Sequence, residues 1–192
     1  IITEHGSEEQ KKELLKKYSD GSMFHVGLGI NNSSIMGNAS DSSVSVDESG
    51  EELILNGTKT GIAFAEEATS FLISATSESG ESNLYVLDKD TEGLEITSKE
   101  FMGLKGLPFS EVNLSNCKIK TSQKLGGHNY SINFQELLDS SRIGMSAMAL
   151  GVCQAVLDYV VPYTNERVAF DEPISNRQSV AFLVADMAIE IE

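Results

Sequence analysis

Residues 53–63 read LILNGTKTGIA, and this stretch indicates that the middle of the chain is built from β-strands. Asn56 and Gly57 join two β-favouring runs, and Asn-Gly in that position is the strongest short signal for a β-hairpin. The second run carries small residues, Gly61 and Ala63, where strands usually carry bulky ones. The stretch therefore predicts a hairpin whose second strand leaves space beside it.

The same pattern of β-favouring runs and turn signals extends on both sides of this stretch, from about residue 23 to residue 120. Short β-favouring runs alternate with turn signals rich in Gly, Ser, Asp and Glu: MFHVGLG, SVSV, ELIL, SFLISAT, NLYVLD, GLEITS, SEVNL and CKIK. Six or more short strands at this spacing predict an antiparallel β-barrel or sandwich.

Helical patterns flank the β-region. At the start, Ser7 and Gln10 have the spacing of a capping box, which predicts a short helix in residues 6–20. Residues 131–161 carry apolar side chains at steps of three and four, which predicts a long helix with a wide buried face. Pro162 is expected to bend or end that helix, and a loop at 171–176 then leads to a second helical run at 177–192.

Composition and charge exclude several classes of partner. The formal net charge is −15, which argues against nucleic acid or an anionic membrane surface as a partner. Two cysteines in 192 residues indicate a reduced, cytoplasmic protein, and three scattered histidines predict no metal site. We find no apolar run of the roughly 18 residues that a membrane span needs. The first residue is Ile and the chain stops inside a helical run, so we expect a fragment.

Six ordered segments resemble the acyl-CoA dehydrogenase family. They are GSEEQKKELL (6–15), ELILNGTK (52–59), DKDTEGLEI (88–96), MGLKGLPFSEVNL (102–114), DSSRIGMSAMALGVCQAVLDY (139–159) and ERVAFDEPISNRQSVAFLVADMA (166–188). The resemblance implies an α+β fold: the end of an N-terminal helical domain (1–22), a middle β-barrel domain (23–125) and the first helices of an incomplete four-helix bundle (126–192).

Members of this family are flavoproteins. The resemblance implies FAD bound between the β-domain and the bundle, its adenosine end reaching a neighbouring subunit of a homo- or hetero-oligomer, a dimer or tetramer. It also implies an acyl-CoA thioester as substrate, which loses its α-hydrogen as a proton to a Glu and its β-hydrogen as a hydride to the flavin.

Three residues match the family motif that holds the adenosine side of FAD: Arg167, Phe170 and Gln178. An Arg suits a pyrophosphate because its planar fork donates two parallel hydrogen bonds. The chain departs from the motif at Ala169, where a polar residue is usual, and at Asp171, where Gly is usual. The competing interpretation is a surface Arg beside an aromatic that anchors a helix end.

Asp139 and Arg142 match family positions that face the acyl-CoA. They lie three residues apart, on one face of the predicted helix. The competing interpretation is an ion pair within the helix on a solvated surface.

The flavin-ring motifs match less well. An ungapped register places the first of them on residues 30–38, so that Ile30, Asn31 and Gly37 take positions that contact the flavin. A register shift would use Ser40 and Asp41 instead. On the strand after Asn-Gly, the family's Trp and Thr become Gly61 and Ala63, whose side chains can neither flank the ring nor donate to it.

No residue is assigned as the catalytic base. Most members carry this Glu beyond the segment that corresponds to residue 192, and a minority carry it where this chain has Ser141. Three functions stay open: an FAD-dependent acyl-CoA dehydrogenase, a non-catalytic or partner-completing subunit that has lost its own flavin-ring site, and a flavin monooxygenase or oxidase on the same fold.

Overall fold

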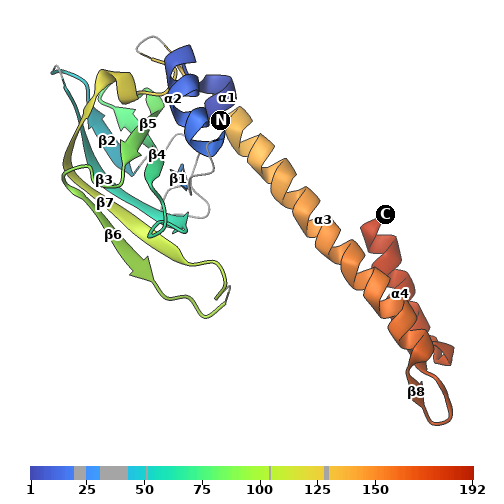
Figure 1. The fold of residues 1–192 in the computed structure, drawn as a ribbon. Coiled ribbons are helices and arrows are strands. Elements are labelled where there is room, and N and C mark those ends of the chain that lie inside the picture. Colours follow the sequence, from blue (N-terminus) through green and yellow to red (C-terminus); the bar gives the residue numbers. More distant parts are fainter. Residues whose placement is uncertain (20–24, 31–42, 51, 104, 128–129) are drawn as a thin grey trace. The chain divides into compact units, whose positions relative to one another are not determined.

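The computed structural model describes residues 1–19, 25–30, 43–50, 52–103, 105–127 and 130–192. The chain divides into two compact units, Ile1–Gln135 and Glu136–Glu192. Figure 1 shows most of the β-strands gathered in the first unit and the long helices in the second.

The described residues of the first unit form two short helices, a seven-stranded sheet and one 3₁₀ turn. The bounds are α1 (Ile2–His5), α2 (Glu8–Ser19), β1 (Val26–Gly29), β2 (Val44–Asp47), β3 (Glu52–Ala63), β4 (Ser70–Ser77), β5 (Ser82–Asp88), β6 (Leu94–Lys99), β7 (Phe109–Lys120) and η1 (Thr121–Gln123). Successive strand pairs link β1 to β4, β4 to β2, β2 to β3, β3 to β7 and β7 to β6. β5 also pairs with β4, on the edge opposite β1 and β2. The predicted α+β class is confirmed, and the sheet is sandwich-like and not a closed barrel in the described residues.

The pairing is mixed, although the sequence predicted an antiparallel domain. β1 and β2 both lie parallel to β4, and the remaining pairs are antiparallel. The two parallel neighbours share one edge of β4, because β1 pairs with residues 70–73 and β2 with residues 76–77. The core lies along these strands and is formed by Val44, Val46, Leu53, Leu55, Ile62, Phe71, Ile73, Ala75, Tyr85, Leu87, Val112, Leu114, Cys117 and Ile119.

The Asn56-Gly57 hairpin prediction is wrong. β3 runs through both residues, and the chain reverses between β2 and β3, after Asp47. Asn56 and Gly57 lie beside a bulge in β7. Leu55 pairs with Cys117 and Gly57 with Leu114, so β7 has one extra residue in this interval. The side-chain oxygen of Asn56 accepts the backbone N–H of Asn116 at 2.7 Å, and Asn116 has a left-handed φ of 53°. The Asn-Gly pair therefore does not form a turn, and Asn56 stabilises a bulge in the neighbouring strand.

Gly57 is required for close approach between β3 and β2. Its φ is +135°, and a Cβ there would lie 2.2 Å from the Ser43 carbonyl oxygen. Residues other than glycine rarely adopt this backbone conformation, and the space is filled by backbone that cannot move aside. Both features exclude a larger residue from this position.

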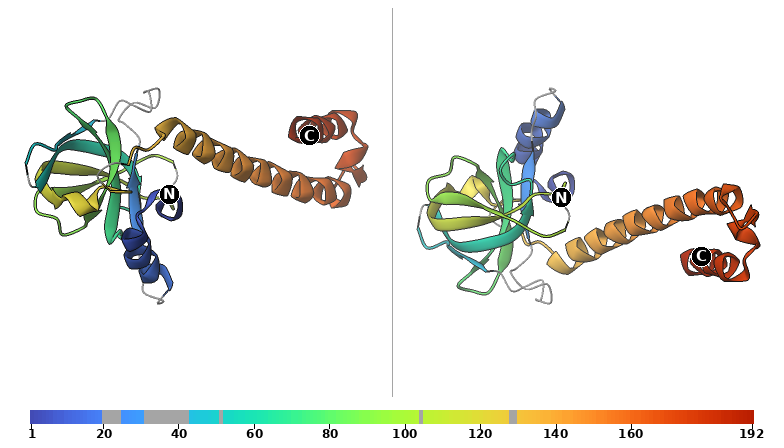
Figure 2. Two further views of the ribbon diagram at one scale, coloured as in Figure 1. Left: turned by 90° about the horizontal axis from the view of Figure 1, so that it is seen from above. Right: turned by 90° about the horizontal axis from the view of Figure 1, so that it is seen from below.

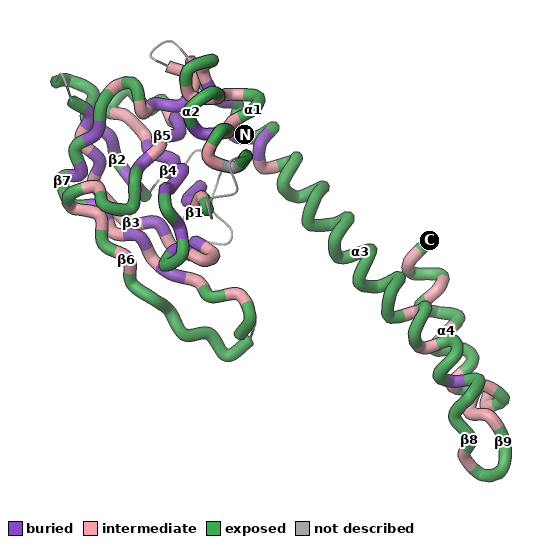
Figure 3. Tube along the Cα trace, in the orientation of Figure 1, coloured by how far each residue is buried: buried purple, intermediate pink, exposed green. Residues whose placement is uncertain are grey.

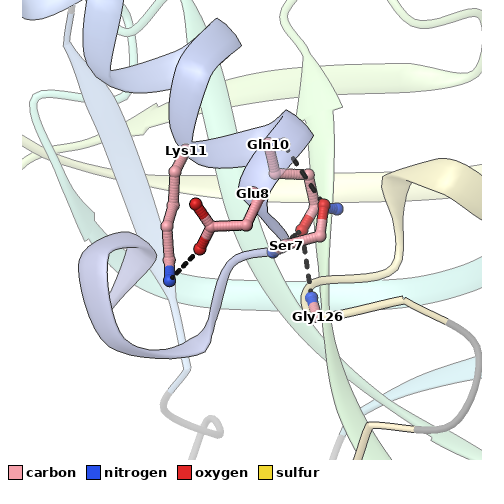
Figure 4. A network of polar contacts seen from close by, with 5 residues as sticks. All are labelled: Ser7, Glu8, Gln10, Lys11 and Gly126. Carbon is pink, nitrogen blue, oxygen red and sulfur yellow. Dashed lines mark hydrogen bonds and ion pairs between the residues drawn. The ribbon is translucent and has the colours of Figure 1, made fainter.

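The predicted capping box at the start of α2 is confirmed (Figure 4). The Ser7 N–H donates to Gln10 Oε1 at 2.9 Å, and the Gln10 N–H donates to Ser7 Oγ at 3.2 Å. Gln10 also binds the sheet, because its Oε1 accepts the Gly126 N–H at 3.0 Å and its Nε2 donates to the carbonyls of Ser122 and Lys124. One side chain therefore both caps α2 and attaches it to the segment after β7.

The second unit is a pair of helices joined by a small hairpin. Its elements are α3 (Phe134–Glu166), which begins in the first unit, β8 (Val168–Ala169), β9 (Glu172–Pro173), η2 (Ile174–Asn176) and α4 (Gln178–Ile191). α4 runs back beside the end of α3 (Figure 2). Pro162 was expected to bend or end α3, but the helix continues one more turn to Glu166. Only that last turn follows the proline, so few hydrogen bonds are at stake.

Most residues of both helices are exposed (Figure 3), and large apolar residues are among them. They include Ile143, Met145, Met148, Val152, Phe182, Leu183 and Ile189. α3 is also long and apolar enough to cross a membrane, with a mean hydropathy of 1.5 in its most apolar window, contrary to our expectation that no such run exists. This is weak evidence, because helices in the cores of soluble proteins pass the same test, and the absence of a membrane span stays a prediction.

Candidate functional site

The second half of β3 carries a bulge at the predicted flavin-ring position. Lys59 and Ile62 face Val112 and Ser110, so β3 has one extra residue in this interval. Gly61 supplies it with a φ of +70°, is exposed, and has no atom within 4 Å of where a Cβ would lie. The space that the sequence predicted beside this strand is therefore present, and the backbone conformation at Gly61 disfavours any larger residue there.

Ala63 ends the strand opposite Phe109 and is half-buried. The next residue, Phe64, has a left-handed φ of 52°, which is unusual for a bulky side chain. Its ring meets the ring of His25 edge-on, with the centroids 5.9 Å apart. No pattern in the sequence indicates this aromatic pair at the exit of β3.

β1 lies against the same half of β3 and brings Ile30 to this end of the sheet. A Cβ on Gly29 would lie 3.1 Å from Ile62 Cδ1 and 3.3 Å from Lys59 Cγ, so glycine permits the close packing. Ile30 is buried, and its carbonyl accepts the Ser74 hydroxyl at 3.1 Å. Asn31, Gly37, Ser40 and Asp41 lie outside the described residues.

Lys59 is a fully buried lysine two residues before Gly61. Burial lowers the pKa of its ammonium group from the ordinary 10.5 to about 8. The sequence pattern does not reveal this burial, because Lys59 lies in a polar-looking run, TKT.

The predicted adenosine-side residues cluster around the β8–β9 hairpin. Its two-residue turn is Phe170 and Asp171, with φ values of 57° and 64°, and the side chain of Phe170 is 86% exposed. Arg167 begins the hairpin, and its carbonyl accepts the Ile174 N–H at 2.9 Å. Gln178 is the first residue of α4. The three matched residues therefore lie at the start of the hairpin, at its turn and at the start of α4.

Arg177 joins this cluster, and the sequence comparison with the motif missed it. Its guanidinium carbon lies 4.6 Å from the centroid of the Phe170 ring, and its Nη2 donates to the Ala169 carbonyl at 3.4 Å. The usable signal was the arginine count, because the chain has only three and two of them lie in this segment.

Asp139 and Arg142 form an ion pair on α3, with Oδ1 and Nη1 3.1 Å apart. Both side chains are exposed, as the surface ion-pair interpretation requires, and this leaves them open to a ligand. Ser141 lies between them, and its hydroxyl donates to the Leu137 carbonyl at 2.9 Å. A serine held in this way offers no proton acceptor of the strength of a carboxylate.

The part of the chain that the structure describes supports neither a metal site nor a reactive thiol. There, no group of three or more His, Cys, Asp and Glu side chains is placed to hold a metal ion. Burial raises the pKa of the Cys117 thiol, which makes it a poor nucleophile, and Cys153 lies exposed on α3.

The two groups of residues fit a flavin dinucleotide unequally. Around the hairpin, exposed Phe170 and two arginines, for which the described residues include no ion pair, suit a planar base and a diphosphate. Around β3, Gly61 and Ala63 leave room for a ring but offer only backbone hydrogen bonds.

Comparison with known proteins gives one consistent result. Residues 32–117 match the family model "Acyl-CoA dehydrogenase, middle domain", and residues 132–192 match "Acyl-CoA dehydrogenase, C-terminal domain". The chain is 33% identical over 202 residues to the short/branched chain specific acyl-CoA dehydrogenase of Rattus norvegicus, covering 100% of this chain and 45% of the relative. It is 31% identical over 201 residues to the short-chain specific enzyme of the same species, of which it covers 48%.

A solved structure agrees with these matches. The crystal structure of a glutaryl-CoA dehydrogenase from Mycobacterium smegmatis in complex with FADH2 superimposes with a TM-score of 0.88 at 26% identity, covering 99% of this chain and 49% of that one. The chain therefore spans about half the length of the proteins it matches.

Proposed function

Because this chain belongs to the acyl-CoA dehydrogenase family, we propose that its protein catalyses the α,β-dehydrogenation of an acyl-CoA thioester with FAD as hydride acceptor. The observation that carries the proposal is the hairpin segment 167–178. It contains the family's Arg, Phe and Gln within twelve residues, and the Phe170 ring is exposed. Neither Arg167 nor Arg177 forms an ion pair in the described residues.

Each residue of this segment has a distinct task in the proposal. Arg167 donates to the pyrophosphate, since a guanidinium pairs two N–H groups with two phosphate oxygens. Phe170 offers a flat apolar surface to the adenine, and Gln178 offers an amide that both donates and accepts. FAD, when bound, supplies the acceptor for the hydride.

The substrate side is assigned to α3. Asp139 and Arg142 are exposed and pair only weakly at such a surface, so a CoA moiety can replace their mutual contact. We assign no catalytic base in residues 1–192.

A second function is favoured by the β3 bulge. Gly61 and Ala63 provide no side-chain donor or aromatic wall where the flavin ring is expected, whereas the hairpin segment retains the Arg, Phe and Gln of its motif. A chain with this combination suits a subunit that completes the adenosine site of a partner chain and has lost its own ring site.

The visible spectrum of the full-length protein distinguishes the two. A stoichiometric flavin that bleaches when an acyl-CoA is added without air supports the dehydrogenase. A colourless protein that acquires flavin only with a partner chain supports the second function. A flavin that acyl-CoA leaves oxidised but NAD(P)H reduces rapidly would contradict both and indicate monooxygenase chemistry.

A further inference from the structure

Asn56 and Gly57 form the one Asn-Gly pair in the chain, because each of the other ten asparagines precedes a residue that has a side chain. In such a pair the backbone nitrogen of the glycine can attack Cγ of the asparagine, since no Cβ shields that nitrogen. The pair is therefore the position at which this backbone is most open to reaction with its own side chain.

The reaction is a deamidation, which consumes only water and is one reason that asparagine is thermolabile. The Gly57 nitrogen loses its proton and bonds to Asn56 Cγ, the bond from Cγ to Nδ2 breaks, and ammonia leaves. A five-membered imide ring results. Water then opens this ring at either of its two carbonyl carbons. Attack at Cγ yields aspartate, whereas attack at the backbone carbonyl carbon yields isoaspartate, in which the main chain continues through the side chain.

The folded sheet holds the two reacting atoms away from each other. β3 is continuous from Glu52 to Ala63, and an extended backbone turns each nitrogen away from the preceding side chain. Asn56 pairs with Ser45 of β2, and its carbonyl accepts the Ser45 hydroxyl at 3.3 Å. Ring closure requires rotation about the bond between Asn56 Cα and this carbonyl carbon, which the pairing with β2 opposes.

The Asn56 side chain is also bound to β7, the strand beside β3 (Figure 1). Its Oδ1 accepts the backbone N–H of Asn116 at 2.7 Å, so the amide group reaches across to the bulge in β7. Both Asn56 and Gly57 are half-buried. A side chain bound to the neighbouring strand can turn back onto its own backbone only when β3 and β7 separate at this point.

We propose that Asn56 is a site of spontaneous deamidation that the native sheet keeps closed and that opens when β3 separates from β2 and β7. The modification therefore records unfolding, because a molecule that stays open long enough acquires a permanent change in β3. This inference goes beyond the proposed function and requires neither a flavin nor an acyl-CoA.

The two products differ in how well they fit the sheet. Aspartate leaves the main chain unchanged, and its side-chain oxygen can still accept the Asn116 N–H. Isoaspartate adds a carbon atom to the main chain just before Gly57, where even a Cβ would lie 2.2 Å from the Ser43 carbonyl oxygen. The added atom also shifts the pairing of Gly57 with Val44 and Leu114. We therefore expect chains that contain isoaspartate to be unable to return β3 to the sheet.

The test compares deamidation of the full-length protein in its folded state and in guanidinium chloride, both at mildly alkaline pH. Cleavage after glutamate releases residues 53–66, in which Asn56 is the one asparagine. Liquid chromatography with mass spectrometry then separates the asparagine, aspartate and isoaspartate forms. We expect Asn56 to convert at least about tenfold more slowly in the folded protein, because the reaction follows the population of the open strand.

Two controls separate the chemistry from the fold. Residues 82–92, released by the same cleavage, contain Asn83 followed by Leu84, and Asn83 should stay unchanged in both states. Gly57→Ala in guanidinium chloride, where folding plays no part, should slow the conversion of Asn56 severalfold, because its Cβ shields the backbone nitrogen.

A refolding step tests the two products. Wild-type protein that has been modified in denaturant is returned to buffer, and size-exclusion chromatography isolates the folded fraction. Chains that contain isoaspartate should be depleted from this fraction, whereas chains that contain aspartate should not.

Three results would overturn the inference. Equal conversion of Asn56 in the folded and unfolded protein would show that the sheet does not close the site. Conversion no faster than that of Asn83 in denaturant would show that Asn56 is not such a site. Equal recovery of isoaspartate and aspartate chains in the folded fraction would remove the permanent record of unfolding. The proposed function stands or falls separately, by the flavin spectrum.

Discussion

Replacement of Lys59 by Met tests whether this lysine is held in an environment that disfavours its charge. Lys59 is fully buried on β3, and its pKa falls from 10.5 to about 8. The unfolded chain therefore binds more protons than the folded chain between these two values, and stability rises with pH through this window. Met retains an unbranched apolar stem and removes the titrating group.

The size of the effect follows from the two pKa values. At pH 7 the folded state carries a cost of about 3 kcal/mol for this group, at 1.4 kcal/mol per pKa unit. About 2 kcal/mol of that cost disappears between pH 7 and pH 9.5, because most of the folded molecules then hold the neutral amine. Wild-type protein should gain this amount relative to Lys59→Met over that interval.

Urea unfolding followed by far-UV circular dichroism at both pH values measures the difference, and the chain contains no Trp that could report it by fluorescence. Lys118→Met is the matched control, because Lys118 is exposed on β7, the strand that pairs with β3. Its difference from the wild type should be the same at both pH values. If the difference for Lys59→Met is equally constant, to within about 0.5 kcal/mol, the buried-charge explanation is refuted.

Three further substitutions or conditions test the first unit. Gly57→Ala should cost about 3 kcal/mol in urea unfolding, because its Cβ meets the Ser43 carbonyl oxygen at 2.2 Å and its φ of +135° strains alanine; a cost below 0.5 kcal/mol would contradict the packing at this position. Glu48→Ala should cost about 3 kcal/mol in the same assay, since Glu48 accepts from buried Lys124 Nζ at 3.1 Å and Tyr85 Oη at 3.0 Å, and an unchanged midpoint would show these contacts to be dispensable. Burial and Glu48 raise the pKa of Tyr85, so stability should fall as pH rises above 10; Tyr85→Phe should not show this loss, and equal slopes would refute the assignment.

Local signals in the sequence predicted much of the secondary structure. The Ser7 and Gln10 spacing specifies a capping box because both hydrogen bonds lie within one helical turn. The periodicity of residues 131–161 specifies α3 for a similar reason, because apolar side chains three or four residues apart lie on one face of a single helix.

Features that depend on a partner strand could not be read from local sequence. SEVNL and CKIK look like two strands, but β7 joins them across a bulge that Asn56 of β3 stabilises. The parallel pairing of β1 and β2 with β4 likewise depends on chain reversals that no short motif encodes.

The candidate site likewise has features that the sequence predicts and features that depend on the folded backbone. Arg167, Phe170 and Gln178 follow a motif within twelve residues, so their proximity along the chain is evident from the sequence. The contact between Arg177 and Phe170 needs the left-handed turn at 170–171, and the bulge at Gly61 needs β7 beside it. Both depend on backbone geometry that side-chain identity alone does not determine.

The attachment of α2 by Gln10 has a consequence for the order in which this protein folds. The hydrogen bonds of Gln10 reach Ser122, Lys124 and Gly126, which lie 112 to 116 residues further along the chain. On a ribosome, α2 is synthesised long before these acceptors and donors, and such distant contacts close slowly. These contacts of α2 can therefore form only after the segment that follows β7 has been synthesised.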